Sequence, residues 1–248
     1  MHNPLEIAFV LVGIAFVATE SRLVQPLYDL RLFAIRPYAA GNVSLLMAFT
    51  SLFVATFLMP FFLERGQGFS VLEAGLLLTP LPLSTLVVAP FSGSLSDKIG
   101  PRLLATSGLV VGALGLLSLA QLGADSSPWD IIWRLVVIGL GQGLFNSPNN
   151  SSILGSVPKP WLGLASGTVA QMRVTGQVLG VAVGGAVFAS GLSAHAPDLG
   201  ESVPQSLLQR DALILAVHDA FYVAAAICVI GIISSLVRGR KTESRKSA

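Results

Sequence analysis

Charged side chains are scarce in this chain of 248 residues: Asp, Glu, Lys and Arg make up 11% of it, against 53% hydrophobic residues and a mean hydropathy of +0.75. A soluble domain carries about 25% charged residues, so this chain has too few to form a fully polar surface. Several windows are mostly apolar over the ~20 residues that cross a bilayer. The composition predicts an all-α, polytopic membrane protein. The alternative, a very apolar soluble core, is disfavoured because these segments are apolar all round.

Residues with redox, metal-binding or nucleophilic chemistry are also scarce. The single cysteine, Cys228, cannot form an internal disulfide, and His2, His195 and His218 lie far apart in the sequence. Neither a Walker-type phosphate loop nor a nucleophile elbow occurs in the chain. The sequence therefore predicts no enzyme, no bound metal and no cofactor.

Seven segments are predicted to form membrane helices. They are residues 5–19, 42–63, 75–95, 103–122, 129–151, 163–190 and 213–237. The first is short for a span, and a cleaved signal peptide is the alternative, although the segment carries Glu6 and lacks a basic start. A third interpretation is that Met1 lies inside a longer helix of a larger parent protein.

Lysine and arginine are distributed unevenly between the two sets of loops. One set, with the C-terminal tail, holds Arg22, Arg31, Arg36, Lys98, Arg102, Lys159, Arg238, Arg240, Lys241, Arg245 and Lys246. The other set holds Arg65 and Arg210. Because cytoplasmic loops are enriched in basic residues, we expect the N-terminus outside and the C-terminus in the cytoplasm. The basic tail is then an orientation signal with weak attraction to anionic lipid, and no nucleic-acid partner is predicted.

Glycine and proline are abundant inside the predicted spans. Gly176, Gly180 and Gly184 recur every four residues, a spacing that predicts a smooth strip for close helix packing. Pro90 and Pro148 interrupt backbone hydrogen bonding within spans, which membranes tolerate where protein or a water-filled cavity satisfies the freed groups. Interrupted helices around a cavity are typical of a transporter.

A compact charged hairpin separates two of these spans on the expected cytoplasmic side. Its pattern G-x-L-x-D-K-x-G-x-R consists of Gly93, Leu95, Asp97, Lys98, Gly100 and Arg102. The pattern resembles the loop signature of the major facilitator superfamily. The resemblance implies a conformational latch, in which the glycine lets two helices approach, the acid contacts the positive end of a neighbouring helix and the bases hold the turn at the surface. Such a contact is worth ~0.3 to 1 kcal/mol at exposed sites. The alternative is a solvated turn.

Longer stretches extend the resemblance over nearly the whole chain. They are QPLYDLRLF, FLMPFFLERGQGFSVLEAGLLLTPLPL, GLGQGLFNSPNNSSI and GLASGTVAQMRVTGQVLGVAVGGAVF. They look like the C-terminal half of the fourteen-helix drug:proton antiporters. The resemblance implies a linker helix at 1–20, a cytoplasmic loop at 21–41, a six-helix transporter bundle at 42–237 and a basic cytoplasmic tail at 238–248.

The same resemblance implies an exporter in the cell membrane that exchanges a small lipophilic substrate, including cationic ones, for protons. This sequence contains no N-terminal bundle, and in the family that bundle carries the membrane acid and arginine to which proton coupling is usually assigned. We therefore expect the chain to need an N-terminal half-bundle or self-association. The alternative is a truncated or split-gene half-transporter that acts only as a partner subunit or is inactive.

Polar side chains within the spans are the candidates for a substrate cavity. Gln142, Asn146 and Asn149 fall at i, i+4 and i+7 on one helix face, which we expect to look onto lipid unless a second chain covers it. The alternative role is hydrogen bonding between helices. A second set, on the next helix, consists of Thr168, Gln171 and Thr175, with Arg173 offset from it. An arginine inside a membrane span predicts a functional role and needs a partner. The alternative is that its side chain snorkels to the membrane surface.

Aromatic and acidic residues complete the set of candidates. Phe49, Phe53 and Phe57 repeat every four residues and predict an aromatic wall for lipophilic cations, with core packing or lipid contact as the alternative. Asp219, near the start of the last span, either titrates or caps its helix.

Overall fold

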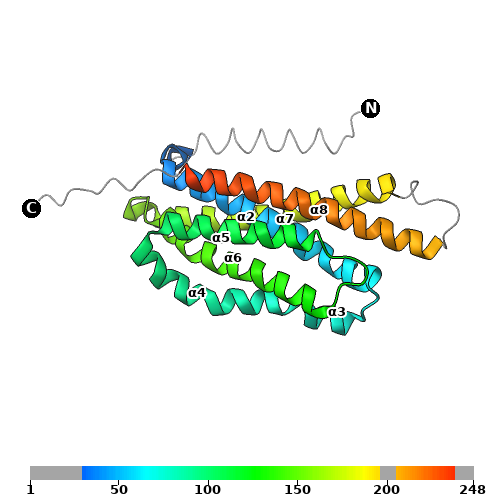
Figure 1. Ribbon diagram of the computed structural model, residues 1–248. Coiled ribbons are helices and arrows are strands. Elements are labelled where there is room, and N and C mark those ends of the chain that lie inside the picture. The colour runs from blue at the N-terminus through cyan, green and yellow to red at the C-terminus, as the bar shows by residue number, and fades with distance from the viewer. Residues whose placement is uncertain (1–29, 196–204, 238–248) are drawn as a thin grey trace, which may run out of the picture.

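The computed structural model describes residues 30–195 and 205–237, and within these ranges every regular element is a helix (Figure 1). The long helices are α2 (Arg36–Phe61), α3 (Val71–Leu78), α4 (Pro80–Ile99), α5 (Pro101–Leu119), α6 (Pro128–Leu154), α7 (Leu162–His195) and α8 (Gln205–Leu236). The short elements are the 3-10 turns η1 (Leu30–Ala34) and η3 (Lys159–Trp161) and the π-helical turn η2 (Phe62–Gly66). The predicted helix at 5–19 and the tail at 238–248 lie outside the described residues.

The all-α prediction is confirmed, but the ends of several helices differ from expectation. The first described span begins at Arg36 rather than at 42, so the last part of the predicted loop 21–41 is helical. Pro37 lies in its first turn, where the missing N–H has no intrahelical partner to lose. The predicted span 75–95 is two helices, because Pro80 begins α4 directly after α3 and Thr79.

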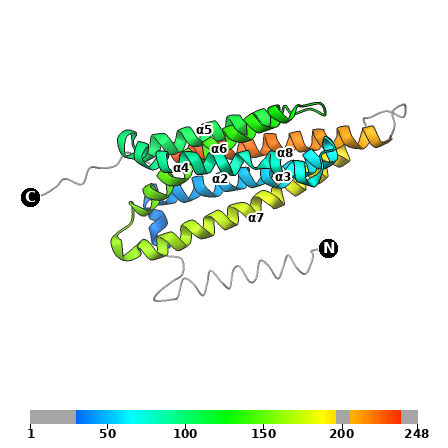
Figure 2. The ribbon, with the colours of Figure 1, turned by 90° about the horizontal axis from the view of Figure 1, so that it is seen from below.

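The helices lie lengthwise in one bundle (Figures 1 and 2). α6 packs between α4 and α5, α8 packs on α5 and α2, and α7 packs on α2 and α8. α2 also touches α6, whereas α4 and α7 lie at the two margins of the bundle. In Figure 1 α4 runs along the lower edge of the bundle, and in Figure 2 α7 does so.

Five helical segments among the described residues are long and apolar enough to cross a membrane. They are Arg36–Gly66, Val71–Ile99, Pro101–Leu119, Lys159–His195 and Gln209–Leu236. The most apolar window of the first segment is 56% buried inside the chain, but that of Val71–Ile99 is only 6% buried and that of Lys159–His195 only 17%. The two marginal helices therefore present long apolar faces that the described residues do not cover.

Glycines set the closest approaches between helices. A Cβ atom added to Gly176 would lie 2.7 Å from the Leu46 carbonyl oxygen on α2, and one added to Gly180 would lie 2.7 Å from the Phe53 Cβ. Such distances are shorter than real Cβ contacts, so only glycine fits at this spacing. The predicted strip Gly176, Gly180 and Gly184 thus lies along the α2 side of α7.

Candidate functional site

The charged hairpin joins α4 to α5 through one residue, Gly100, whose φ of 90° is a conformation that favours glycine. Arg102 donates to the carbonyl of Leu236 at the end of α8, and the hydroxyls of Thr106 and Ser235 lie 2.8 Å apart just beyond it. A cation at a helix C-terminus is stabilised by the helix dipole. The arginine of the hairpin therefore fastens the start of α5 to the end of α8.

The other side chains of the hairpin pattern are exposed and make no polar contact with the described residues. Leu95, Asp97 and Lys98 are exposed, and Asp97 makes no hydrogen bond or ion pair with another described residue. The close approach implied for Gly93 is not seen: an added Cβ would lie 3.5 Å from the Ser147 Oγ, an ordinary contact distance. The latch contact that the resemblance implies for Asp97 therefore stays a prediction.

The three amides of α6 do not form one open face. Asn149 is fully buried, and its Nδ2 donates to the Gly41 carbonyl of α2 at 3.3 Å. Gln142 lines a pocket inside the bundle, and the Oδ1 of Asn146 is buried without a hydrogen-bond partner. The expectation that this face looks onto lipid is wrong for Asn149, because α2 packs beside α6 and covers it.

The pocket at Gln142 lies where four helices meet. Its lining comes from α2, α5, α6 and α8 and consists of Ala48, Ser51, Leu52, Gly108, Leu109, Gly112, Leu116, Ile138, Gly141, Gln142, Phe145 and Cys228. Its volume of about 20 Å³ is enough for one water molecule. Drug-sized ligands occupy clefts of roughly 300 to 1,000 Å³, so this pocket is not a drug site.

The polar residues of α7 point in two directions. Thr168 is buried and donates to the Leu164 carbonyl of its own helix, and the Gln171 Nε2 lies 3.5 Å from the Thr175 Oγ1. Arg173 is two residues from both Gln171 and Thr175, so it lies on nearly the opposite side of the helix. This agrees with the offset of Arg173 from the polar set that the sequence predicts.

Arg173 makes its side-chain contact with an aromatic ring of α2. Its Cζ lies 5.2 Å from the centroid of the Phe49 ring, within the range of a cation–π interaction. The side chain is half-buried, and its Nε is buried without a hydrogen-bond partner. An arginine at the centre of a membrane helix costs ~2.5 to 3.5 kcal/mol on insertion scales, so an unpaired one is a functional candidate.

The phenylalanine stripe lies largely within the contact between α2 and α7. The rings of Phe49 and Phe53 stack at 6.5 Å, and those of Phe57 and Phe61 meet edge to face at 5.5 Å. Phe49 is only 6% exposed, and the Cβ of Phe53 faces the glycine strip. Core packing therefore explains most of the stripe, and the Phe49 ring face is already taken by Arg173.

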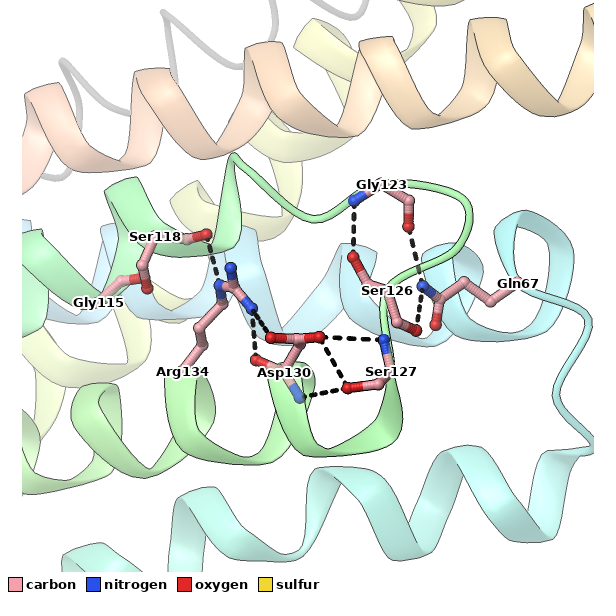
Figure 3. A network of polar contacts seen from close by, with 8 residues as sticks. All are labelled: Gln67, Gly115, Ser118, Gly123, Ser126, Ser127, Asp130 and Arg134. Atoms are coloured by element: carbon pink, nitrogen blue, oxygen red, sulfur yellow. Dashed lines mark hydrogen bonds and ion pairs between the residues drawn. The ribbon is translucent and has the colours of Figure 1, made fainter.

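A polar network lies at the opposite end of the bundle from Gly100 (Figure 3). Within it, the i, i+4 spacing of Asp130 and Arg134 in the sequence predicts their pairing, whereas the contacts of Gln67 were not predicted. Gln67 donates to the carbonyls of Gly123 and Ser126 in the turn between α5 and α6. Arg134 donates to the Ser118 carbonyl at 2.9 Å and pairs with Asp130 at 3.4 Å. Most of the acceptors are backbone carbonyls, which every residue carries, so residue types gave no signal for them.

Further contacts from α8 reach the same end. Arg210 donates to the carbonyls of Gly66 and Ala124, and His218 donates to that of Leu122 at 2.6 Å. The His195 Nε2 lies 2.8 Å from the Asp219 Oδ2, which joins the end of α7 to α8. Asp219, a candidate for titration or capping, is thus part of a contact between helices.

These features define a polytopic helical membrane protein with polar residues distributed along helix faces. Among the described residues no group of three or more metal-ligating side chains converges. The chain belongs to the Major Facilitator Superfamily, whose family model matches residues 7–181.

Individual relatives agree with the family. The riboflavin transporter RibZ of Clostridioides difficile (strain 630) is 32% identical over 239 residues, which cover 96% of this chain and 51% of RibZ. The uncharacterized transporter YebQ of Escherichia coli (strain K12) is 38% identical over 177 residues, covering 71% of this chain and 39% of YebQ.

A third relative is the multidrug resistance protein Stp of Mycobacterium tuberculosis (strain CDC 1551 / Oshkosh), 32% identical over 206 residues, or 83% of this chain and 38% of Stp. The chain thus spans about half the length of these relatives or less. Two of these relatives are described as transporters and the third as a multidrug resistance protein.

Proposed function

We propose that the chain is the C-terminal part of a proton-coupled exporter of small lipophilic molecules, of the fourteen-helix type. The observation that carries this proposal is the pair of uncovered helices, α4 and α7, on a bundle that spans about half of its relatives. In transporters of this class the substrate site lies between two bundles near the bilayer midplane. One bundle therefore supplies half of a site.

Three polar candidates for that half-site remain after the residues with contacts inside the bundle are set aside. Asn146 carries an unpaired buried amide oxygen, Arg173 an unpaired Nε, and Gln171 is exposed on α7. Asn149 donates a hydrogen bond to α2, and Gln142 lines the pocket inside the bundle, so both are assigned to helix packing. The proposed partner is an N-terminal half-bundle or a second copy of the chain, and the proposed coupling ion is the proton.

The test compares the chain alone with the chain produced together with the N-terminal bundle of a full-length relative. We expect the chain alone to accumulate poorly or to self-associate, and to show no drug-dependent proton flux in liposomes. Co-production should raise accumulation and give efflux, measured with a fluorescent drug and a pH-sensitive dye in inverted vesicles.

Efflux by a purified monomer of the chain would overturn this proposal. Accumulation without efflux, after complementation, would instead favour the second function, a half-transporter that serves only as a partner subunit or is inactive. The matched control is the relative's N-terminal bundle alone, which should give no efflux.

A further inference from the structure

Arg173 lies near the middle of the candidate membrane span Lys159–His195, and a bilayer centred on that span is least polar there. The middle residue of the span Arg36–Gly66 is Ser51, so Phe49 lies two residues, or ~3 Å along the axis, from the middle. The guanidinium lies 5.2 Å from the centroid of the Phe49 ring. The side chain therefore stays near mid-depth instead of snorkelling to the membrane surface.

The Arg173 guanidinium makes no hydrogen bond with another described residue. Arginine has five N–H donors and no acceptor, and a ring face satisfies its charge without providing a hydrogen-bonding oxygen. The buried Nε has no partner. The ion pairs among the described residues, Arg134 with Asp130 and His195 with Asp219, do not include it.

The position of Arg173 leaves it open to another molecule. The glycine strip of α7 faces α2, and Arg173 lies at the edge of that contact, half-buried. The α7 span is among the least covered of the bundle, with 17% of its apolar window buried. A molecule on this side of α7 would contact the Arg173 guanidinium, whose Cζ lies over the Phe49 ring.

We propose that Arg173, held in place by the Phe49 ring, forms a subsite for the carboxylate of a lipophilic small-molecule substrate. This inference rests on the proposed exporter function and deepens it by assigning the charge of the substrate. A carboxylate accepts paired N–H bonds from a guanidinium. A lipophilic cation is excluded from the same place, because the Phe49 ring face is already occupied by a cation and like charges repel.

A lipid phosphate has similar acceptor chemistry, but headgroups lie ~15 Å from the midplane of a 30 Å hydrocarbon core. The depth of the Phe49 ring therefore favours a small molecule that enters the core over a headgroup.

The experiment measures equilibrium binding of three pyrene probes that differ only in the end group: pyrene butyrate, pyrene butanol and pyrene butylammonium. The chain is placed in phosphatidylcholine nanodiscs, and empty nanodiscs supply the partition background. We expect the butyrate to bind about tenfold or more tightly than the butylammonium, because a carboxylate accepts charge-assisted hydrogen bonds from the guanidinium, whereas an ammonium has no acceptor and carries the same charge. The butanol should bind with intermediate affinity.

The variants separate this role from a structural one. Arg173→Gln should remove most of the preference for butyrate, and Arg173→Lys should keep part of it. The matched control is Arg65→Gln, which removes an arginine held 5.9 Å from the Phe61 ring in the same stripe but at the exposed end of the span. It should leave the preference unchanged. Circular dichroism checks that each variant is folded, and the ratio of butyrate to butylammonium affinity is a readout that a packing role would not move.

Saturable binding that favours butyrate and depends on Arg173 supports the subsite. Absence of saturable binding, equal or tighter binding of the ammonium probe, or an unchanged preference in Arg173→Gln would overturn it. Anionic phosphatidylglycerol discs test the lipid source: loss of the difference between wild type and Arg173→Gln there would assign the site to headgroups and overturn the proposal. Failure of complemented transport with intact charge preference would instead refute the exporter function alone.

Discussion

Two asparagines one turn apart on α6 show how single residues acquire different roles. Asn149 donates to the α2 backbone and is fully buried, whereas Asn146 keeps a buried amide oxygen without a partner. The same residue type at similar depth is thus structural in one case and a candidate for binding in the other. Glycines differ in the same way: Gly180 lies against α2, but an added Cβ at Gly167 would meet nothing within 4 Å.

Gly180→Val tests the close approach of α7 to α2. Because the added Cβ would lie 2.7 Å from the Phe53 Cβ, we expect the helices to separate and the stability to fall by ~1 to 3 kcal/mol, the usual cost of overpacking. The measurement is thermal unfolding of the chain in detergent. Gly167→Val on the same helix is the control and should have little effect; equal losses in both would refute the packing assignment.

At the scale of elements, the loops and helix ends hold the bundle together at both of its ends. Arg102 fastens the α4–α5 hairpin to the end of α8, and at the opposite end Gln67 and Arg210 bind carbonyls of the α5–α6 turn. Helices in lipid have little apolar driving force to associate, so polar contacts at their ends matter more than in water. α8 takes part in the contacts at both ends.

Arg102→Gln should loosen the end of α8. Loss of the bond to the Leu236 carbonyl leaves the last turn without its cation, so we expect faster hydrogen exchange of amides near Ser235. Lys98→Gln removes a charge from the same hairpin at an exposed position, and it is the matched control. Equal exchange rates in both variants would contradict the fastening role.

Arg210→Gln should weaken the other end. The wild-type guanidinium donates to the carbonyls of Gly66 and Ala124, and losing both bonds should lower stability by ~1 to 3 kcal/mol, since part-buried carbonyls are left unsatisfied. Thermal unfolding measures the change. Arg65→Gln, which removes an exposed arginine near the same end of the bundle, is the comparison; a smaller loss for Arg210→Gln than for this control would speak against the network.

At the scale of the whole molecule, orientation in the membrane remains a prediction from the loop charges. In a Cys228→Ala background, which removes the single cysteine, we expect Ser202→Cys to react with an impermeant thiol reagent in intact cells and Ser244→Cys to be protected. Permeabilised cells provide the control, in which both positions should react. The reverse pattern in intact cells would overturn the proposed topology.

The sequence by itself determined the class of the protein, its family and most of the helices among the described residues. Low charge and repeated apolar windows leave helices in a membrane as the stable arrangement, because backbone groups in lipid must bond within the segment. The hairpin pattern from Gly93 to Arg102 and the four-residue glycine spacing of α7 are local features that can be read directly from the chain. The strip of Gly176, Gly180 and Gly184 lies against a neighbouring helix, as its spacing predicts.

Tertiary structure decided which polar residues face a neighbour and which remain free. The i, i+4, i+7 spacing places Gln142, Asn146 and Asn149 on one side of a helix, but it carries no information about which helix packs there. The spacing offsets Arg173 from the threonine and glutamine set, but only the α2–α7 contact placed its guanidinium on the Phe49 ring. Helix periodicity is a property of one segment, whereas burial and pairing depend on the packing of helices distant in sequence.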